Sequence, residues 1–516
     1  MTTARPAIVP LPTTMELTGG SYELNSQTTI ACDPGAADCA HLLRHYLDVT
    51  GLPLAPGTVH APAGITLRLT PGEAGLGAEG YQLSATLDGV HISAVSTAGL
   101  RHGIQTLRQL LPPQVFGTKP QPGLIWRIPC VEISDSPRFG WRGSLLDVGR
   151  WYMPMDYLYR YVETLAVHKL NRFHLHLTED QGWRFEVKRY PRLTAIGAWR
   201  RESQLGHLRE HRYDGIPHGG YYTQQELRDL VAFAALRGVE VVPEIDVPGH
   251  ATAAIAAYPE LGNGPDPVAV SRGWGIHTSV LNIEEPTLEF VENVIDELID
   301  VFPSGWVHIG GDECPTTEWA ASPAVRDRLR SLDLNGVDRI QEWFTNRISA
   351  HLRSNGRTAI VWDEAVTDGL HESTLVMAWR SERHGVEAAA RGYRVVMSPQ
   401  ERTYFDWSQS DEPGEPVAQE GLTTLRQVFD YDPSPQRLAA AVRQRIIGTQ
   451  GQLWTEYLQT PQRVDDMAYP RLCALAERAW SPTDTDYPGF ADRLTTHAQR
   501  LTAAGVTVRE IHPSTV

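Results

Sequence analysis

Two kinds of hydrophobic pattern divide the chain. Residues 1–135 hold short runs in which apolar and polar positions alternate, such as ITLRLT (65–70) and YQLSATLDGVHISA (81–94), and a helix-length stretch at 97–111. Such alternation is typical of strands that bury one face. These segments predict a small α+β domain over 1–135, in which the Pro/Gly-rich segment 111–123 forms a surface connection before the last strand.

The rest of the chain, 136–516, alternates apolar strand-length runs with amphipathic helix-length segments. The predicted strands are 142–150, 172–180, 239–250, 306–313, 358–365, 375–380, 393–399 and 446–456. The longest predicted helices are 155–170, 225–238, 286–302, 337–356 and 464–480. Eight strands separated mostly by helical or connecting segments predict a parallel (β/α)8 TIM barrel. A doubly wound open sheet is the alternative, although no G-x-G-x-x-G motif follows the first strand.

Composition and charge narrow the classes of partner. The 516 residues include 46 basic and 62 acidic side chains, a formal net charge of 46 − 62 = −16. Phosphate backbones and anionic membrane surfaces are repelled by such a chain, so we expect neither nucleic acid nor a membrane as a partner. The N-terminus lacks a signal-peptide pattern and no apolar run reaches about 18 residues, which predicts a cytoplasmic protein, with secretion as the alternative if a leader has been trimmed from the sequence.

The cysteines give little support to a disulfide framework or a structural zinc site. They are odd in number, scattered and without C-x-x-C spacing: Cys32, Cys39, Cys130, Cys314 and Cys473. We expect reduced thiols, with a Cys32–Cys39 pair as the alternative.

Polar side chains gather where the eight predicted strands end. In chain order the ends carry Asp147 and Arg150; His176, Glu179 and Asp180; Glu244, Asp246 and His250; Asp312 and Glu313; Trp362, Asp363 and Glu364; Trp379 and Arg380; Tyr404 and Asp406; Trp454 and Glu456. One such residue alone is more often a solvated carboxylate or a core-edge tryptophan, but eight ends in succession predict the active site of a barrel. Carboxylates and arginine bond hydroxyl groups, and indoles stack on sugar rings, so the set predicts sugar hydrolysis.

The segment WVHIGGDECP (306–315) places two carboxylates, Asp312 and Glu313, next to each other. Successive Cα atoms are about 3.8 Å apart, so both side chains lie on one wall of the cleft. A retaining pair of carboxyl groups faces across the sugar at about 5 to 5.5 Å, and an inverting pair is farther apart. One of the two can act as an acid, and the nucleophile then comes from another strand or from the substrate itself.

Six segments share the pattern of a known family. They are LDVGRWYMP (146–154), FHLHLTEDQGWR (173–184), VPEIDVPGHA (242–251), HIGGDE (308–313), VWDE (361–364) and QLWTE (452–456). In this order they resemble glycoside hydrolase family 20, the β-N-acetylhexosaminidases, and the N-terminal α+β domain resembles the non-catalytic domain of that family. The resemblance implies a retaining exo-glycosidase that needs no metal or other cofactor. Its substrates would be oligosaccharides, such as chitin fragments, or glycoconjugates with a terminal β-linked GlcNAc or GalNAc.

The resemblance also implies a substrate-assisted mechanism, in which the carbonyl oxygen of the substrate's 2-acetamido group is the nucleophile. Asp312 orients the acetamido nitrogen and stabilises its developing positive charge, while Glu313 is the general acid and base. Each of these carboxylates raises the pKa of the other, and burial adds to this effect.

Further residues receive roles by the same resemblance. Tyr404 donates its hydroxyl to the acetamido oxygen, with Asp406 beside it. His250 pairs with either Glu179 or Asp180 and tunes Glu313. The remaining substrate-binding residues are Arg150 and Glu456, which bind sugar hydroxyls, and Trp362, Trp379 and Trp454, which wall the acetamido pocket.

Two other functions compete with this interpretation. His174 and His176 project to one face of a strand near Glu179, which is also typical of metal ligands, and His250 could join them. The tryptophans, however, have no role in metal-assisted hydrolysis. A sugar-binding barrel without catalysis is the third hypothesis, and the presence of both adjacent carboxylates disfavours it.

The glycine- and aromatic-rich segment GIPHGGYYTQQEL (215–227) follows the second predicted strand. It could form a rim loop near the leaving group. Thr223 with Glu226 three residues later is typical of a capping box that starts a helix, and we favour this interpretation.

Overall fold

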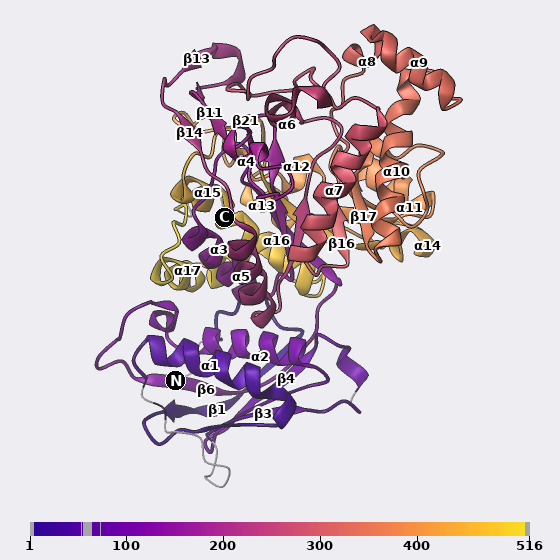
Figure 1. Cartoon of the computed structure of the whole chain (residues 1–516). Helices are drawn as coiled ribbons and strands as arrows, with labels where there is room; N and C mark the ends of the chain where they lie inside the picture. Colours follow the sequence, from indigo (N-terminus) through magenta and orange to yellow (C-terminus); the bar gives the residue numbers. More distant parts are fainter. Residues whose placement is uncertain (1–4, 53, 55–63, 73, 511–516) are drawn as a thin grey trace.

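The computed structural model describes residues 5–52, 54, 64–72 and 74–510. Its N-terminal domain is one six-stranded sheet with strand order β1-β6-β4-β5-β3-β2. The strands are β1 (Thr14–Leu24), β2 (Ile30–Cys32), β3 (Ile65–Leu69), β4 (Tyr81–Ala85), β5 (Val90–Ala94) and β6 (Trp126–Asp135). Figure 1 shows α1 (Ala37–Val49) and α2 (Thr97–Leu110) between this sheet and the rest of the molecule. The predicted α+β character is therefore confirmed, while the predicted boundary between residues 135 and 136 stays a prediction.

Eight later strands close into the predicted parallel barrel, and the open sheet is excluded. They are β7 (Trp141–Asp147), β8 (Arg172–His176), β15 (Glu240–Glu244), β16 (Trp306–His308), β17 (Thr358–Trp362), β18 (Leu375–Ala378), β19 (Arg394–Met397) and β22 (Ile446–Leu453). The register sets Asp147 beside His176, His176 beside Glu244, and Glu244 beside His308. The carboxyl ends of four neighbouring strands therefore finish at one level.

Helices surround the barrel (Figure 1). The longer ones are α3 (Met155–Val167), α5 (Gln224–Leu236), α7 (Glu285–Val301), α10 (Ile340–Ser354), α11 (Glu382–Ala390), α15 (Pro461–Ala468), α16 (Arg471–Trp480) and α17 (Tyr487–Ala503). Shorter ones are α8 (Thr317–Ala321), α9 (Pro323–Ser331), α12 (Gln400–Thr403), α13 (Leu425–Phe429) and α14 (Ala440–Arg443). The start of α5 confirms the capping box, because the Thr223 side chain accepts from the Glu226 N–H while the Glu226 side chain accepts from the Thr223 N–H.

Two details of the sequence analysis were wrong. The predicted closing helix 464–480 is two helices, because Pro470 has no N–H to donate and the residue before a proline is disfavoured in the helical region. Tyr469 accordingly has φ −109° and ψ 130°. The connection 111–123 is not wholly on the surface, since Val115 and Phe116 are buried in the core of the N-terminal domain.

Insertions at the carboxyl ends of the strands build the rim of the barrel. After β8 come β9 (Thr178–Glu179), β10 (Gly182–Trp183), α4 (Arg192–Ala195), β11 (Trp199–Arg200), β12 (Gln204–Leu205), β13 (Arg212–Tyr213) and β14 (His218–Gly219). After β15 comes α6 (Thr252–Ala257), and after β19 come β20 (Trp407–Ser408) and β21 (Gln419–Leu422). Figure 1 shows these insertions at the end of the barrel that is far from the N-terminal domain.

A buried ion pair joins the two domains. Lys169 Nζ, just before β8, lies 2.7 Å from Asp135 Oδ2 at the end of β6, and both side chains are fully buried. The Tyr81 hydroxyl and the Trp480 indole N–H also donate to Asp135, at 2.7 and 3.0 Å. Burial alone would raise the pKa of Asp135, but Lys169 and these hydrogen bonds hold it below its usual value. The carboxylate is therefore kept ionised by partners from both domains.

The described residues show neither a membrane span nor a disulfide. No helix in this part of the chain combines the length and the apolar composition needed to cross a bilayer. All five cysteines are free, so the alternative Cys32–Cys39 pair is absent.

Candidate active site

The turn after β16 carries the two adjacent carboxylates. Gly310 and Gly311 have φ values of 66° and 88°, and a Cβ on Gly310 would lie 1.6 Å from Asp246 Oδ1. Only glycine fits there, because this carboxylate oxygen accepts the Gly311 N–H at 3.1 Å. Glu313 follows with φ 42°, a left-handed conformation that is unusual for a residue with a side chain. The turn therefore aims Asp312 and Glu313 into the mouth of the barrel through a strained backbone.

Four carboxyl groups meet at this turn. Burial, followed by the charge of Asp312, raises the pKa of Glu313 to about 7 and that of Glu364 also to about 7. The same two causes raise the pKa of Asp246 well above its usual value. Glu364 Oε2 accepts the backbone N–H of Glu313 at 3.0 Å, which ties the end of β17 to the turn. At neutral pH the cluster therefore holds protons that isolated carboxylic acids would have lost.

His250 stands between two pairs of acids. Its Nδ1 lies 3.0 Å from Glu179 Oε2 and 3.2 Å from Asp180 Oδ2, so the structure places both candidate partners against it. Its Nε2 faces the opposite pair, 3.8 Å from Asp312 Oδ2 and 3.7 Å from Glu313 Oε2. Burial alone would lower the pKa of His250, but Glu179 and the hydrogen bonds to both acids raise it well above its usual value. A positive imidazolium therefore lies within reach of Glu313. Like Glu313, His250 has a positive φ, of 47°.

Arg150 lies near His250 in the barrel mouth, because both pair with Glu179. Its Nη2 lies 2.7 Å from Glu179 Oε1 and 3.9 Å from Glu456 Oε1. Asp147, at the end of β7, accepts the Arg150 N–H at 3.1 Å and the Thr455 N–H at 3.0 Å, so it fixes the loops after β7 and β22 together. Burial favours neutral arginine, but these carboxylates raise the pKa of Arg150 well above its usual value. The side chain is thus a fixed cation at the bottom of the site.

Asp406 and Glu456 supply free acceptors beside Arg150. Burial, followed by the charge of Glu456, raises the pKa of Asp406 well above its usual value. Asp406 Oδ1 and Glu456 Oε2 are buried and have no partner among the described residues, while Gln419 Nε2 donates to Glu456 Oε1 at 3.2 Å. Unsatisfied buried acceptors of this kind are suited to the hydroxyl groups of a ligand.

Aromatic side chains form the wall between these groups. Trp379 stacks on Tyr404 with ring centroids 6.0 Å apart, and Tyr404 and Trp362 each lie near Trp454, at 6.4 and 5.8 Å. The guanidinium of Arg150 lies 5.2 Å from the Trp454 ring. Burial, followed by the charges of Asp406, Asp312 and Glu313, raises the pKa of Tyr404 well above its usual value, so its hydroxyl stays a donor. All twelve predicted site residues therefore lie in one connected cluster at the carboxyl ends of the barrel strands.

Below the site, Glu244 is the centre of a buried polar cluster. It accepts from Trp362 Nε1 at 3.0 Å and pairs with His176 Nδ1, while His174 Nε2 and His308 Nδ1 lie 3.0 and 2.8 Å from its oxygens. His176 Nε2 lies 3.2 Å from Glu179 Oε1. Both nitrogens of His176 therefore contact carboxylates, whose charges raise its pKa well above the usual value against the effect of burial.

Several groups here are close enough to hold a metal ion. Ligand atoms lie within 4.8 Å of one another in the sets His174, Glu244 and His308, and His176, Glu179 and Asp246. In the second set, however, both nitrogens of His176 are already taken by carboxylates, whereas a metal-bound histidine keeps one nitrogen for the ion. In this second set the hydrogen-bond pattern therefore favours a proton network over a metal centre.

The sequence analysis places Asp246 and Glu364 at strand ends but gives them no role, and it does not mention Gln419. Asp246 and Glu364 are polar residues directly after apolar strands, as are the residues to which the sequence analysis gave roles. Gln419 lies in the insertion after β19, where no periodic pattern or motif distinguishes it. Its contact with Glu456 is set by the folded chain alone.

Comparison with known proteins gives consistent matches. The model of the Glycosyl hydrolase family 20 catalytic domain matches residues 139–483, and that of Glycosyl hydrolase family 20 domain 2 matches residues 5–136. A Beta-hexosaminidase of Porphyromonas gingivalis is 38% identical over 97% of this chain and 64% of its own length. A Beta-hexosaminidase of Vibrio furnissii is 34% identical over 93% of this chain and 77% of its own length. The chain thus spans less than two thirds of the first relative.

Solved structures agree with these matches. The GH20 Exo beta-N-Acetylglucosaminidase from Vibrio harveyi, in complex with N-acetylglucosamine, is 32% identical with a TM-score of 0.88, over 98% of this chain and 78% of that one. A mutant Streptomyces plicatus beta-hexosaminidase in complex with product (GlcNAc) is 34% identical with a TM-score of 0.84, over 98% and 97%.

Proposed function

The chain belongs to glycosyl hydrolase family 20, and on this basis we infer that it is a β-N-acetylhexosaminidase. Its substrates are small oligosaccharides or glycoconjugates that end in a β-linked N-acetylhexosamine, with GlcNAc as the terminal sugar. The bound sugars named for two of its structural neighbours support this choice. The observation that carries the proposal is the adjacent pair Asp312 and Glu313, whose carboxylate oxygens lie 3.8 and 3.7 Å from His250 Nε2. The raised pKa of Glu313, about 7, supports it.

The proposed reaction begins with the acetamido group of the substrate. Its carbonyl oxygen attacks the anomeric carbon, the glycosidic bond breaks, and Glu313 gives its proton to the departing oxygen. The product of this step is an oxazolinium ion. Asp312 accepts the acetamido N–H and stabilises the positive charge, while the Tyr404 hydroxyl donates to the acetamido oxygen. A water molecule then attacks the anomeric carbon, the bond from this carbon to the acetamido oxygen breaks, and Glu313 takes the proton of the water. The acetamido group is regenerated and the configuration is retained.

His250 supports both states of Glu313. Below pH 7 the acid is largely protonated and ready to donate. After the transfer, the new carboxylate lies about 3.7 Å from the imidazolium nitrogen, which stabilises its charge. Because Glu179 and Asp180 hold this imidazolium in its charged form, they act as positioning residues for the general acid.

The remaining residues bind the sugar. Arg150 and Glu456 lie where the hydroxyl groups of a terminal sugar would reach the bottom of the site, and Asp406 offers a further acceptor. The three tryptophans, Trp362, Trp379 and Trp454, enclose the acetamido methyl group. Such contacts favour a ligand with an apolar ring face and several hydroxyl groups.

The deciding experiment compares two aryl glycosides that differ only at the 2-position. We expect hydrolysis of the β-N-acetylglucosaminide and a rate lower by orders of magnitude for the β-glucoside, because only the first carries an internal nucleophile. Comparable rates, or a glycosyl ester on any carboxylate of the protein, would contradict the mechanism. The matching galactosaminide measures how strongly the site distinguishes the two hexosamines.

A further inference from the structure

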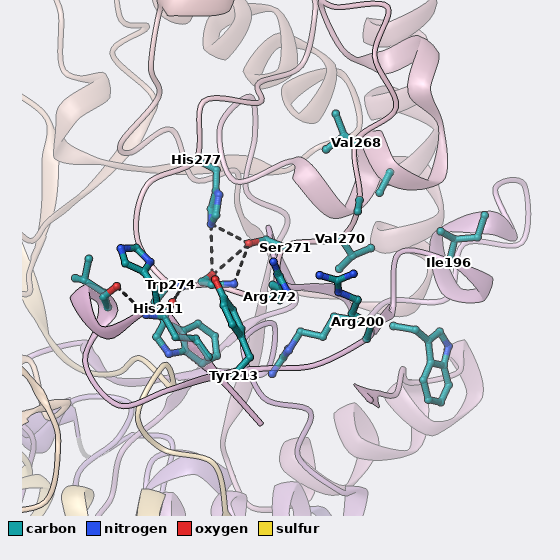
Figure 2. Close-up of a pocket in the computed structure, with 17 residues that line it drawn as sticks. Ile196, Arg200, His211, Tyr213, Val268, Val270, Ser271, Arg272, Trp274 and His277 are labelled. Atoms are coloured by element: carbon teal, nitrogen blue, oxygen red, sulfur yellow. Dashed lines mark hydrogen bonds between the residues drawn. The ribbon is translucent and has the colours of Figure 1, made fainter. Parts of the chain in front are cut away.

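A second cavity of about 740 Å³ lies in the rim, between the insertions after β8 and β15. It is lined by residues of β11 to β13, by Ala256 of α6 and by 268–274 with His277, and Figure 2 shows these side chains around it. The volume is within the range of pockets that hold small molecules, about 300 to 1,000 Å³. None of the residues to which we assign a role in the reaction lines it.

The lining is basic in a chain whose net charge is −16. Its ionisable members are Arg200, Arg201, His211, Tyr213, Arg272 and His277, with no aspartate or glutamate among them. Glu202, just outside the lining, pairs with Arg201 at 3.2 Å and with Arg272. Among the described residues, Glu202 is the one carboxylate that forms an ion pair with any of the three arginines, while Asp214 and Asp147 act on Arg200 without an ion pair. The lining itself therefore carries an excess of positive charge.

Arg200 is the least compensated of these groups. It is 3% exposed, it forms no ion pair within the described part of the chain, and burial lowers its pKa to about 9. Its guanidinium lies near the rings of both Trp151 and Trp274, at 4.8 and 5.6 Å from their centroids. A buried cation without a counter-ion is unfavourable, and an anionic ligand would relieve this.

The buried side-chain atoms of the lining that lack a hydrogen-bond partner among the described residues are both donors. Arg200 Nη2 and Trp274 Nε1 are buried and have no partner among the described residues, and neither can accept a hydrogen bond. Aromatic surface accompanies them. Trp199 is 51% exposed, and the ring of Tyr213 carries the Arg272 guanidinium at 4.2 Å. A ligand for this cavity therefore needs acceptor atoms, a negative charge and a ring that can stack.

We propose that this cavity is a second saccharide site, which binds a uronic acid residue of a glycan chain. The carboxylate pairs with the arginines, ring and hydroxyl oxygens accept from Trp274 and Arg200, and the sugar face stacks on Trp199. The inference rests on the proposed function only in taking the ligand to be a glycan. With such a second site, the enzyme would prefer glycans that contain acidic sugars.

The cavity also touches the backbone of the active site. Arg200 Nη1 donates to the carbonyl oxygen of Arg150 at 2.6 Å, and the N–H of Ser271 donates to the carbonyl oxygen of Asp180 at 3.0 Å. A sugar bound in this cavity therefore contacts the same loops that position Arg150 and Asp180 in the catalytic site.

The test uses a tetrasaccharide of alternating glucuronate and GlcNAc with glucuronate at its non-reducing end, which an exo-acting N-acetylhexosaminidase leaves intact. The matched neutral probe is the same tetrasaccharide with its carboxyl groups reduced to alcohols. Titration calorimetry on the full chain should give at least about tenfold tighter binding of the acidic probe, the size of one charge-assisted hydrogen bond.

Variants locate the binding. Arg272→Gln and Trp199→Ala should each weaken binding of the acidic probe at least about fivefold, a loss of about 1 kcal/mol. Arg347→Gln removes an arginine of comparable exposure from α10, outside the cavity, and should bind like the wild type. Turnover of an aryl β-N-acetylglucosaminide, followed in each variant, reports separately on the catalytic site and on folding.

Three outcomes would overturn the proposal. They are equal affinity for the two probes, unchanged binding in both cavity variants, and displacement of the acidic probe by inorganic sulfate at equal concentration, which would show a plain anion site. Because none of these readouts depends on hydrolysis, failure of the second site is distinguishable from failure of the proposed activity.

Discussion

Glu313→Gln is the perturbation that tests the general acid most directly. A carboxyl group with a pKa of about 7 is about 90% protonated at pH 6 and about 10% protonated at pH 8, so the wild type should lose most of its acid form across this interval. General acid catalysis contributes about 10²- to 10⁴-fold to a rate. We therefore expect kcat/KM for chitobiose at pH 6 to fall by this factor in the variant, and the decline toward alkaline pH to disappear.

Two comparisons sharpen this experiment. An aryl substrate that leaves as a stable phenolate needs little protonation, so its kcat/KM should fall much less than that of chitobiose. Glu364 has the same raised pKa of about 7, so a pH profile of the wild type alone cannot tell which carboxyl group titrates. Glu364→Gln is the control, and it should retain the alkaline decline.

The assay is an initial-rate profile from pH 5 to pH 9, with released GlcNAc measured directly for chitobiose. The assignment of Glu313 as the acid is refuted if the alkaline decline persists in Glu313→Gln and vanishes in Glu364→Gln. It is also refuted if both substrates lose the same factor, because the loss would then not depend on the leaving group.

Further changes test other parts of the molecule. Asp312→Asn should lower kcat/KM for the acetamido substrate about 10²- to 10³-fold, the usual effect of removing one group that stabilises transition-state charge, and should hardly change the slow hydrolysis of the 2-hydroxyl analogue. Tyr404→Phe removes one donor to the acetamido oxygen and should lower kcat about 10²-fold with an intact fold by circular dichroism, whereas an unchanged kcat would exclude the role. Lys169→Met leaves Asp135 unpaired in the domain junction, so urea denaturation should show a loss of about 3 to 5 kcal/mol, and Asp135→Asn in the same chain should restore part of it. Protein treated with a chelator and shown by elemental analysis to be metal-free should keep its activity, and recovery of lost activity by added zinc would revive the metalloenzyme hypothesis.

The sequence predicted the barrel well because each strand carries two signals. An apolar run marks the strand, and the polar residues after it, such as Asp147 after β7 and Glu456 after β22, mark its functional end. The wrong helix prediction arose where the hydrophobic pattern and a proline gave conflicting signals. The helical pattern of 464–480 was continuous in hydrophobicity, yet Pro470 interrupts it.

Contacts between distant segments were beyond the sequence alone. Asp246 contacts the glycines before Asp312 because of the register between β15 and β16. The sequence of either strand alone does not determine this register. The choice between Glu179 and Asp180 as partner of His250 stayed open for a related reason. Neighbouring residues usually point apart, but the loop after β8 turns so that both carboxyl groups reach the same ring nitrogen.

The positive φ angles of His250 and Glu313 imply that the protein gives up some folding stability to keep its catalytic activity. Such backbone conformations typically cost about 1 to 3 kcal/mol for a residue that carries a side chain, and glycine escapes most of this cost. Replacing the acid by glycine should therefore yield an inert protein that withstands heat better than its parent. A search for heat-tolerant variants by folding alone would discard the very side chains that move the proton.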